Sequence, residues 1–159
     1  KGLAKAIIEG IENARYDRVI VMDGDFSHDP KDVKKLLKAL KHSDLVIGSR
    51  FMNTDRPEMP LHRYFGIKFF NGLLRLFTGV RLTDCTSGFK AYKSTLISML
   101  LSKLKENQYG ALEVIVKAKR LGARICERPI RSVAAVKTSK GKLKYGYNLL
   151  RSLLNALIG

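Results

Sequence analysis

The first third of the chain alternates short apolar runs with longer segments whose apolar residues recur every three or four positions. The runs at 18–22 and 45–47 are rich in β-branched residues and apolar on both faces, which is typical of buried parallel strands. Helical spacing marks residues 2–14 before the first run and 29–41 between the runs, where an Asp-Pro pair suits a helix start. The order strand, helix, strand predicts a right-handed βαβ unit and hence a parallel sheet.

The rest of the chain continues the alternation of helices and strands. The predicted elements are helices over 61–78, 94–104, 109–121 and 145–158 and strands over 87–93 and 123–127, with loops over 52–60 and 133–144. Gly122 directly follows one of these helices, as expected of a C-terminal stop. No internal repeat or linker interrupts the pattern, so we expect residues 1–159 to form one α/β domain, with amphipathic helices near 61–78 and 145–158.

The composition agrees with a packed domain and indicates an anionic partner. The chain has 159 residues, of which 45% are hydrophobic, enough for a core. The 30 Lys and Arg residues outnumber the 14 Asp and Glu residues, so the formal net charge is +16. Such a charge favours a nucleic acid, a phosphorylated substrate or an anionic membrane. No apolar run approaches the roughly 20 residues of a membrane-spanning helix.

The cysteines and the first residues indicate the setting of the chain. Cys85 and Cys126 form no CxxC pair, so they give neither a zinc signature nor a disulfide framework. We therefore expect two reduced thiols in an intracellular protein. The start, Lys1-Gly2-Leu3, lacks a Met and does not look like a signal peptide, so we expect the chain to begin inside a longer protein.

A pair of carboxylates follows the first predicted strand. Asp23 and Asp25 lie at its carboxyl end, where open α/β sheets bind ligands, and side chains two apart in extended backbone point to the same side. Two carboxylates together with substrate phosphate oxygens are a usual way of holding Mg²⁺ or Mn²⁺. Ser27 and His28 are close enough to ligate or orient, and we expect His28 to cap or pack rather than act as a base. An Asp-Gly turn leading into the next helix is an equally good interpretation of the bare pattern.

Six short segments follow one another in a fixed order along the chain. They are 1–3 with Gly10, 22–30 (MDGDFSHDP), 46–51 (VIGSRF), Asp84 with 87–92 (SGFKAY), Glu113 within 112–115, and 122–130. In this order they resemble the motifs KGLG…G, MDADLQHPP, VVGSRY, D…SGFRAY, QxEL and GYKIVEVPI of family 2 glycosyltransferases, in particular the dolichyl-phosphate (polyprenyl-phosphate) mannosyltransferases and glucosyltransferases. The resemblance covers nearly all of the chain. It implies a GT-A-like (Rossmann-like) α/β fold, with a mostly parallel sheet flanked by helices.

The chain departs from the family pattern at three places. The family begins with a strand bearing VIPTYNE and a second strand, which bind the nucleotide base and ribose, and both are absent here. The resemblance therefore implies a partial domain, the C-terminal two-thirds of the catalytic domain, whose missing N-terminal part is an expected partner. The late RxxGxSKL motif is matched only at its end, by residues 141–143, with Lys137 as the nearest counterpart of its Arg. The chain has no Trp, so the QxxRW motif of processive synthases is missing.

The resemblance implies a metal-dependent, inverting transfer of a sugar to dolichyl or another polyprenyl phosphate. Mg²⁺ or Mn²⁺, held by Asp23, Asp25 and Ser27, would neutralise the diphosphate of the nucleotide sugar. The lipid phosphate, held by Arg50 and Arg63, would attack the sugar C1 in line. Mannose from GDP-mannose is the expected donor, and glucose from UDP-glucose is the alternative.

Further roles implied by the resemblance have plainer alternatives. Asp84, which we count with Asp25 among the catalytic residues, would position the acceptor or a donor hydroxyl, or it only caps a loop. Ser87 and Gly88 would form a tight turn beside the phosphate. Glu113 would form a hydrogen bond in the active site, or it is an exposed helical residue.

Three basic residues are candidates for binding phosphate. Arg50, the third catalytic candidate, follows a predicted strand, and its guanidinium could hold a phosphate through two hydrogen bonds. It could instead be a surface residue paired with Asp44 or Asp55. Lys140 and Lys142, in a basic loop, would close on the donor diphosphate, or they are solvated charges without a specific role.

Basic residues are concentrated between Lys117 and Arg151, where Glu127 alone is acidic. Such residues are attracted to anionic lipid, and helices 61–78 and 145–158 have the Phe, Leu, Tyr and Lys/Arg composition of interfacial helices. Their apolar faces would equally serve to cover the sheet, and we expect both uses. We therefore expect a peripheral position at the cytoplasmic face of a membrane, with an anionic membrane surface as a partner.

Two rival interpretations belong to other classes of protein. A basic nucleic-acid-binding module would show strongly salt-dependent binding without metal. The aromatic residues, however, fall on predicted core stripes and no RNP, KH or helix-turn-helix pattern occurs, so no nucleic acid is expected as a partner. An inactive, truncated fragment would keep the fold but lack the nucleotide-binding part.

Overall fold

The protein is built on a four-stranded mixed sheet with the strand order β1-β3-β2-β4. The computed structural model describes residues 3–53, 59–103, 110–131 and 142–158. The strands are β1 (Arg18–Val21), β2 (Leu45–Ser49), β3 (Lys90–Lys93) and β4 (Ile125–Pro129). β2 pairs with β4 in parallel, whereas β3 runs antiparallel to both β1 and β2. β1, β2 and β4 therefore run in one direction and β3 runs against them.

The position of β3 corrects one prediction. The sequence favoured β1 and β2 as the two parallel strands of a βαβ unit, and they do run the same way, but β3 lies between them. Its Tyr92 pairs with Val19 on one side and with Leu45 on the other. The strand predicted over 87–93 is also shorter, because hydrogen-bonded pairing begins only at Lys90.

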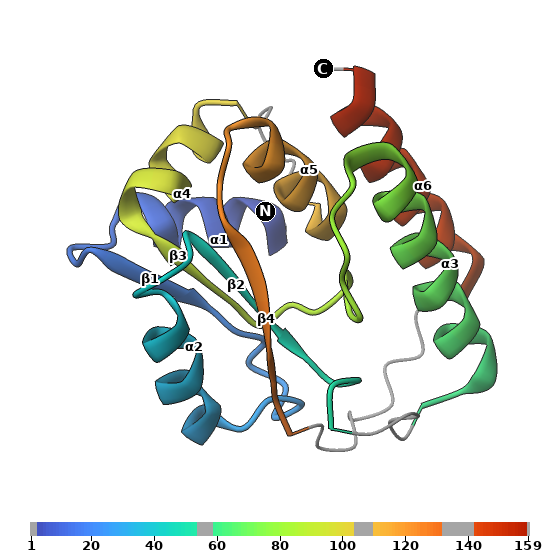
Figure 1. Cartoon of the computed structure of the whole chain (residues 1–159), viewed down its shortest axis with the longest axis horizontal. Helices are drawn as coiled ribbons and strands as arrows, with labels where there is room; N and C mark the ends of the chain where they lie inside the picture. The colour runs from blue at the N-terminus through green and yellow to red at the C-terminus, as the bar shows by residue number, and fades with distance from the viewer. Residues whose placement is uncertain (1–2, 54–58, 104–109, 132–141, 159) are drawn as a thin grey trace.

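Helices cover both faces of the sheet (Figure 1). They are α1 (Leu3–Glu12), a 3₁₀ turn (Pro30–Asp32) leading into α2 (Val33–Ala39), α3 (Leu61–Thr78), α4 (Ser94–Leu101), α5 (Ala111–Arg120) and α6 (Lys142–Ile158). α2 packs on one face, and the other helices contribute to a larger core on the opposite face. β2 alternates accordingly, since Leu45 and Ile47 join the larger core and Val46 the smaller one.

Local signals set several helix ends. The Asp29 carboxylate accepts a hydrogen bond from the Lys31 amide at 2.9 Å, and Pro30 occupies the first helical position, as predicted. α3 has the predicted bounds and ends at Gly79, whose φ of 71° is in the left-handed region. Gly122, with φ of 76°, follows α5 in the same way. Most of the loop predicted over 133–144 lies outside the described residues, and α6 begins at Lys142 rather than at 145.

Two further expectations concern the cysteines and the membrane. Cys85 is buried, Cys126 is partly buried, and both are free thiols. None of the helices in the described ranges is both long enough and apolar enough to span a bilayer.

Candidate active site

Asp25 lies in an exposed loop just beyond the carboxyl end of β1. Its Oδ1 accepts a hydrogen bond from the Ser27 amide at 3.0 Å, and hydrogen bonds from the Ser27 hydroxyl and then from this amide hold the pKa of the Asp25 carboxyl below its usual range. The chain turns sharply between the two residues because Phe26 adopts a φ of 62°, which is rare outside glycine. Asp25 is therefore a charged, solvent-facing carboxylate, and Ser27 acts on it directly.

Asp23 packs against the turn that precedes β3. A Cβ atom at Gly88 would lie 2.9 Å from the Asp23 carboxyl carbon, which is too close for any side chain. On another side, the Nδ1 atom of buried His28 is 3.9 Å from Asp23 Oδ2. Gly88 thus leaves the space that the Asp23 carboxylate fills.

His28 packs as expected, on the ring of Phe89, with 5.1 Å between ring centroids. Burial lowers the pKa of His28, and the charge of Asp23 opposes this shift. Within the described ranges, its Nδ1 is buried without a hydrogen-bond partner. A buried polar atom of this kind, facing a carboxylate, is a common feature of ligand sites.

The donor set fits a divalent cation that shares its coordination with a substrate. In the described part of the chain, no three His, Cys, Asp or Glu residues come together as a metal cage. Asp23 and Asp25 instead provide two carboxylates open to solvent, with the orphaned His28 Nδ1 behind Asp23. Mg²⁺ is usually bound in this way, through one or two carboxylates plus substrate phosphates.

Arg50 and Asp84 form one buried unit. The Arg50 Nε and Nη2 atoms donate to the two Asp84 carboxylate oxygens at 2.7 and 2.9 Å, and Nη2 also donates to the Thr86 hydroxyl at 3.2 Å. The Asp84 side chain is fully buried and that of Arg50 is only 12% exposed. Arg50 is therefore not the surface residue of the alternative prediction. Asp44 pairs with Arg124 and Lys93, and Asp55 lies outside the described residues.

Sequence reasoning missed the residues that hold Asp84 in place. The Glu127 carboxylate on β4 accepts hydrogen bonds from the Thr83 amide, the Thr83 hydroxyl and the Asp84 amide at 2.7, 3.0 and 2.8 Å. From α3, Asn71 Nδ2 donates to the Thr83 carbonyl at 2.7 Å and Oδ1 accepts from the Cys85 amide at 3.0 Å. Burial raises the pKa of Glu127. Glu127 was within reach of the sequence, because it is the Glu of the segment 122–130; nothing in the sequence marks Asn71.

Lys90 is a second residue that the sequence reasoning did not single out. Its side chain is fully buried behind the turn at Ser87 and Gly88, and Nζ donates to the Ser87 carbonyl. Burial lowers the pKa of Lys90 to about 8, against the opposing charge of Asp84. The Ser87 hydroxyl accepts from the Phe89 amide at 3.2 Å, so the predicted tight turn is present and held from two sides.

The remaining predicted residues lie elsewhere or outside the description. Arg63 is exposed in the first turn of α3, and no contact among the described residues links it to Asp23 or Arg50. Glu113 is buried and pairs with Lys117 at 2.7 Å, so it is not an exposed helical residue. Lys140 lies outside the described residues, as does the side chain of Lys142.

Comparison with known proteins decides the family. The family described as "Glycosyl transferase family 2" matches residues 1–101. The chain belongs to glycosyltransferase family 2. It is 36% identical over 136 residues to the undecaprenyl-phosphate mannosyltransferase of Micrococcus luteus, a match that covers 81% of this chain and 56% of that protein. It is 28% identical over 140 residues to a UDP-N-acetylglucosamine–dolichyl-phosphate N-acetylglucosaminyltransferase of Methanococcus voltae, covering 84% of this chain and 56% of that protein.

Solved structures of family 2-like enzymes share the fold. Glucosyl-3-phosphoglycerate synthase from Mycobacterium tuberculosis, crystallised with Mn²⁺, uridine diphosphate and phosphoglyceric acid, superposes with a TM-score of 0.74 at 18% identity. The match covers 99% of this chain and 54% of that one. The predicted GT-A-like fold of a partial domain is thus confirmed, with a mixed sheet. This glycosyltransferase chain spans about half the length of the relatives that it matches.

Proposed function

We propose that this glycosyltransferase chain transfers a sugar from a nucleotide sugar to a polyprenyl or dolichyl phosphate, with a divalent cation and with inversion at C1. The observation that carries the proposal is the meeting of three sequence segments at one place. The Asp23 carboxylate beyond β1 packs against Gly88, and the same 84–88 turn carries Asp84, which is paired with Arg50 beyond β2. Acidic and basic groups suited to a metal and to phosphates are therefore held side by side.

The chain's own residues would bind and orient the reactants. Asp25 and Asp23 would hold Mg²⁺ or Mn²⁺, which when bound neutralises charge on the donor diphosphate. The Ser27 hydrogen bonds keep Asp25 ionised for this purpose. Asp84 fixes the Arg50 guanidinium through two hydrogen bonds, so that its position beside the phosphates needs little reorganisation.

The bond changes of the proposed transfer are simple. An oxygen of the lipid phosphate forms the new bond to the sugar C1, and the bond from C1 to the donor diphosphate breaks. The nucleoside diphosphate leaves with the electron pair. The acceptor phosphate is already ionised near pH 7, so no general base is required, consistent with a packing role for His28. Positioning and charge stabilisation would supply most of the rate.

GDP-mannose is the donor that we propose, and UDP-glucose is the alternative. The support for mannose is the 36% identity to a protein named undecaprenyl-phosphate mannosyltransferase. We also propose that the enzyme works at the cytoplasmic face of a membrane, because the anionic cytoplasmic leaflet attracts basic proteins and this chain has a formal net charge of +16.

The test is transfer of labelled sugar to a polyprenyl phosphate in detergent with Mn²⁺. The protein is the longest product that the gene encodes, because this chain spans only about half of its relatives. We expect Asp25→Ala to lower kcat by about 100-fold or more. Asp17→Ala, at the opposite end of β1 and paired only with its neighbour Arg18, is the matched control and should stay within about twofold of the parent protein. Equal rates in the two variants, or no transfer from either GDP-mannose or UDP-glucose, would contradict the proposal.

A further inference from the structure

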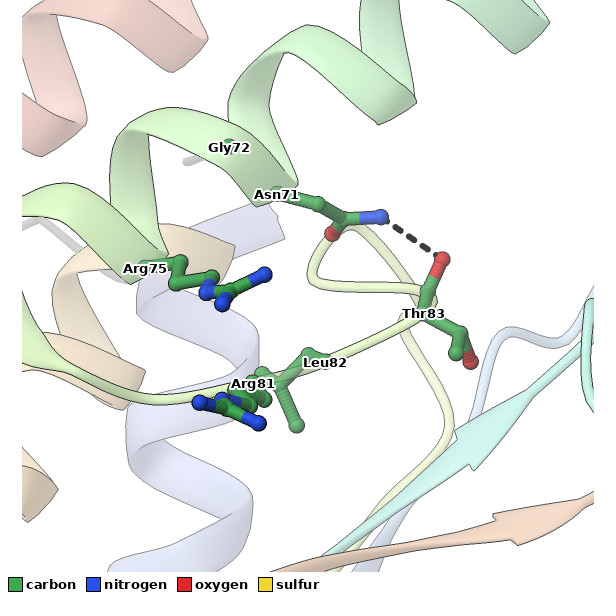
Figure 2. Close-up of a pocket in the computed structure, with 6 residues that line it drawn as sticks. All are labelled: Asn71, Gly72, Arg75, Arg81, Leu82 and Thr83. Carbon is green, nitrogen blue, oxygen red and sulfur yellow. Dashed lines mark hydrogen bonds between the residues drawn. The ribbon is translucent and has the colours of Figure 1, made fainter.

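We propose that a cavity between α3 and the segment leading to Asp84 binds a phosphate group. The cavity has a volume of about 250 Å³ and is lined by Asn71, Gly72, Arg75, Arg81, Leu82 and Thr83 (Figure 2). Asp23, Asp25, Arg50 and Asp84 do not line it. The site is therefore additional to the candidate active site, and it stands whether or not the proposed sugar transfer is correct.

Two arginines on separate elements give the cavity its charge. Arg75 extends from α3 toward the segment that carries Arg81, and both side chains are exposed (Figure 2). In the ranges that the structure describes, no carboxylate pairs with either guanidinium, and no lining residue is acidic. Arginines elsewhere do meet a carboxylate: Arg18, Arg50, Arg124 and Arg131. Arg75 and Arg81 thus remain available to an anion from outside the chain.

The walls of the cavity are held at a fixed separation. The Asn71 amide bridges them, with Nδ2 donating to the Thr83 carbonyl at 2.7 Å and Oδ1 accepting from the Cys85 amide at 3.0 Å. Gly72 contributes no side chain to the space between them. Because the two guanidinium groups grow from walls that are already joined, binding an anion there requires little ordering of the backbone.

Size and chemistry favour phosphate. The cavity is smaller than the pockets of about 300–1,000 Å³ that enclose drug-sized ligands, so it suits a small group. Planar guanidinium groups match phosphate oxygens with paired hydrogen bonds. Arg81 also lines an adjoining cavity of about 430 Å³ that includes Lys119, so the positive charge continues past the first cavity.

The phosphate could be the headgroup of a lipid or part of a soluble phosphate ester. Leu76, next to Arg75, and Phe69 are exposed on α3, so a lipid headgroup in the cavity would have apolar side chains beside it. A soluble ester would use the same two arginines without them. The chemistry that recognises the ligand is the same in both cases.

The experiment measures phosphate binding by the full chain. The probes are glycerol 3-phosphate, followed by calorimetry, and phosphatidylcholine vesicles with or without phosphatidylglycerol, followed by sedimentation. The test variant is Arg75→Ala/Arg81→Ala. The control is Lys34→Ala/Lys38→Ala, which removes the same charge from exposed positions on α2, across the sheet.

We expect the arginine variant to bind one of the probes about tenfold more weakly, and the lysine variant to stay within about twofold of the parent chain. A selective loss with glycerol 3-phosphate would identify a soluble ester as the ligand. A selective loss only with phosphatidylglycerol vesicles would identify a lipid headgroup. Equal losses in both variants would mean that unspecific charge explains the binding, and unchanged binding in the arginine variant would likewise overturn the proposal. None of these results depends on sugar transfer.

Discussion

The backbone at residue 88 passes so close to Asp23 that the two cannot both keep their places if 88 carries a side chain. A Cβ there would overlap the carboxylate, with 2.9 Å to its carboxyl carbon. The Asp23 side chain is 47% exposed, so it can rotate away without disturbing the core. The cost of a side chain at 88 therefore falls on the position of the carboxylate and much less on folding.

Gly88→Ala tests this separation of binding from stability. We expect the affinity for Mn²⁺ in the presence of the nucleoside diphosphate to fall about 10–100-fold, because one of the two carboxylates is displaced. The free energy of unfolding should change by less than about 1 kcal/mol, because a flexible side chain gives way. Calorimetric titration with Mn²⁺ and urea unfolding measure the two effects.

Gly10→Ala is the matched control. Gly10 lies inside α1, and a Cβ there would meet nothing within 4 Å. Alanine should stabilise the helix by about 0.5–1 kcal/mol and leave the Mn²⁺ affinity unchanged. If Gly88→Ala binds Mn²⁺ as tightly as the parent protein, Asp23 does not hold the metal.

At the scale of elements, one carboxylate joins the ends of three strands. Asp44 directly precedes β2, and its side chain binds Lys93 Nζ at the end of β3 at 2.8 Å. It also accepts from the Arg124 amide and Nε, just before β4, at 3.0 and 3.1 Å. The hydrogen bonds from Arg124, and next from Lys93, hold the pKa of the Asp44 carboxyl well below its usual range.

This arrangement predicts a loss of stability in acid. As the pH falls through the ordinary Asp value of about 3.9, the unfolded chain takes up a proton before folded Asp44 does. The contribution of Asp44 to stability is therefore complete above about pH 5 and is lost progressively below pH 4. Asp44→Asn should cost about 1–3 kcal/mol at pH 7 and should show a shallower fall in unfolding free energy between pH 5 and pH 3.

Urea unfolding at several pH values measures both effects. Asp17→Asn is the control, because Asp17 is exposed and pairs only with the adjacent Arg18 at 3.5 Å. It should leave the pH dependence as it is in the parent chain. Parallel pH profiles for Asp44→Asn and the parent would show that the Asp44 contacts add nothing to stability.

The elements also show which features a sequence reveals. The bounds of α3 could be predicted because the pattern that buries Ile67 and Leu74 lies within the helix itself and Gly79 ends it. The place of β3 could not, because its apolar residues fit any neighbouring strand equally well. The position of Asp23 and Asp25 at the end of β1 followed from local order.

The contacts around the candidate site were less accessible to prediction. Arg50 and Asp84 are 34 residues apart, and Glu127 is 43 residues from Asp84. Each is a common surface residue type, and only packing in three dimensions makes them partners. The prediction for Glu113 was incomplete for the same reason, since its burial comes from α5 packing against α6.

At the scale of the whole molecule, α3 and α6 lie side by side and expose apolar side chains away from the sheet (Figure 1). On α3, Leu61, Phe65, Phe69 and Leu76 follow helical spacing opposite the buried residues, and Lys68 and Arg75 flank them. We call these four apolar residues the outer stripe of α3. On α6, Tyr147, Leu150 and Leu154 are exposed in the same way. An apolar strip with flanking cations is the usual composition of helices that lie in a membrane interface.

Phe65→Ser/Phe69→Ser tests whether the outer stripe enters lipid. Both rings are at least 60% exposed, so their loss should leave the fold intact, while partial burial of two rings in a bilayer is worth about 2 kcal/mol. We expect the variant to partition into anionic vesicles roughly 30-fold more weakly, and the deficit to persist in high salt, which screens the lysines and arginines but not the apolar contact. Tyr16→Ser/Met99→Ser, which removes exposed apolar groups on other parts of the surface, should partition like the parent chain. If the two double variants partition alike, or if salt abolishes the difference between them, the outer stripe does not enter the bilayer and charge alone brings the protein to the membrane.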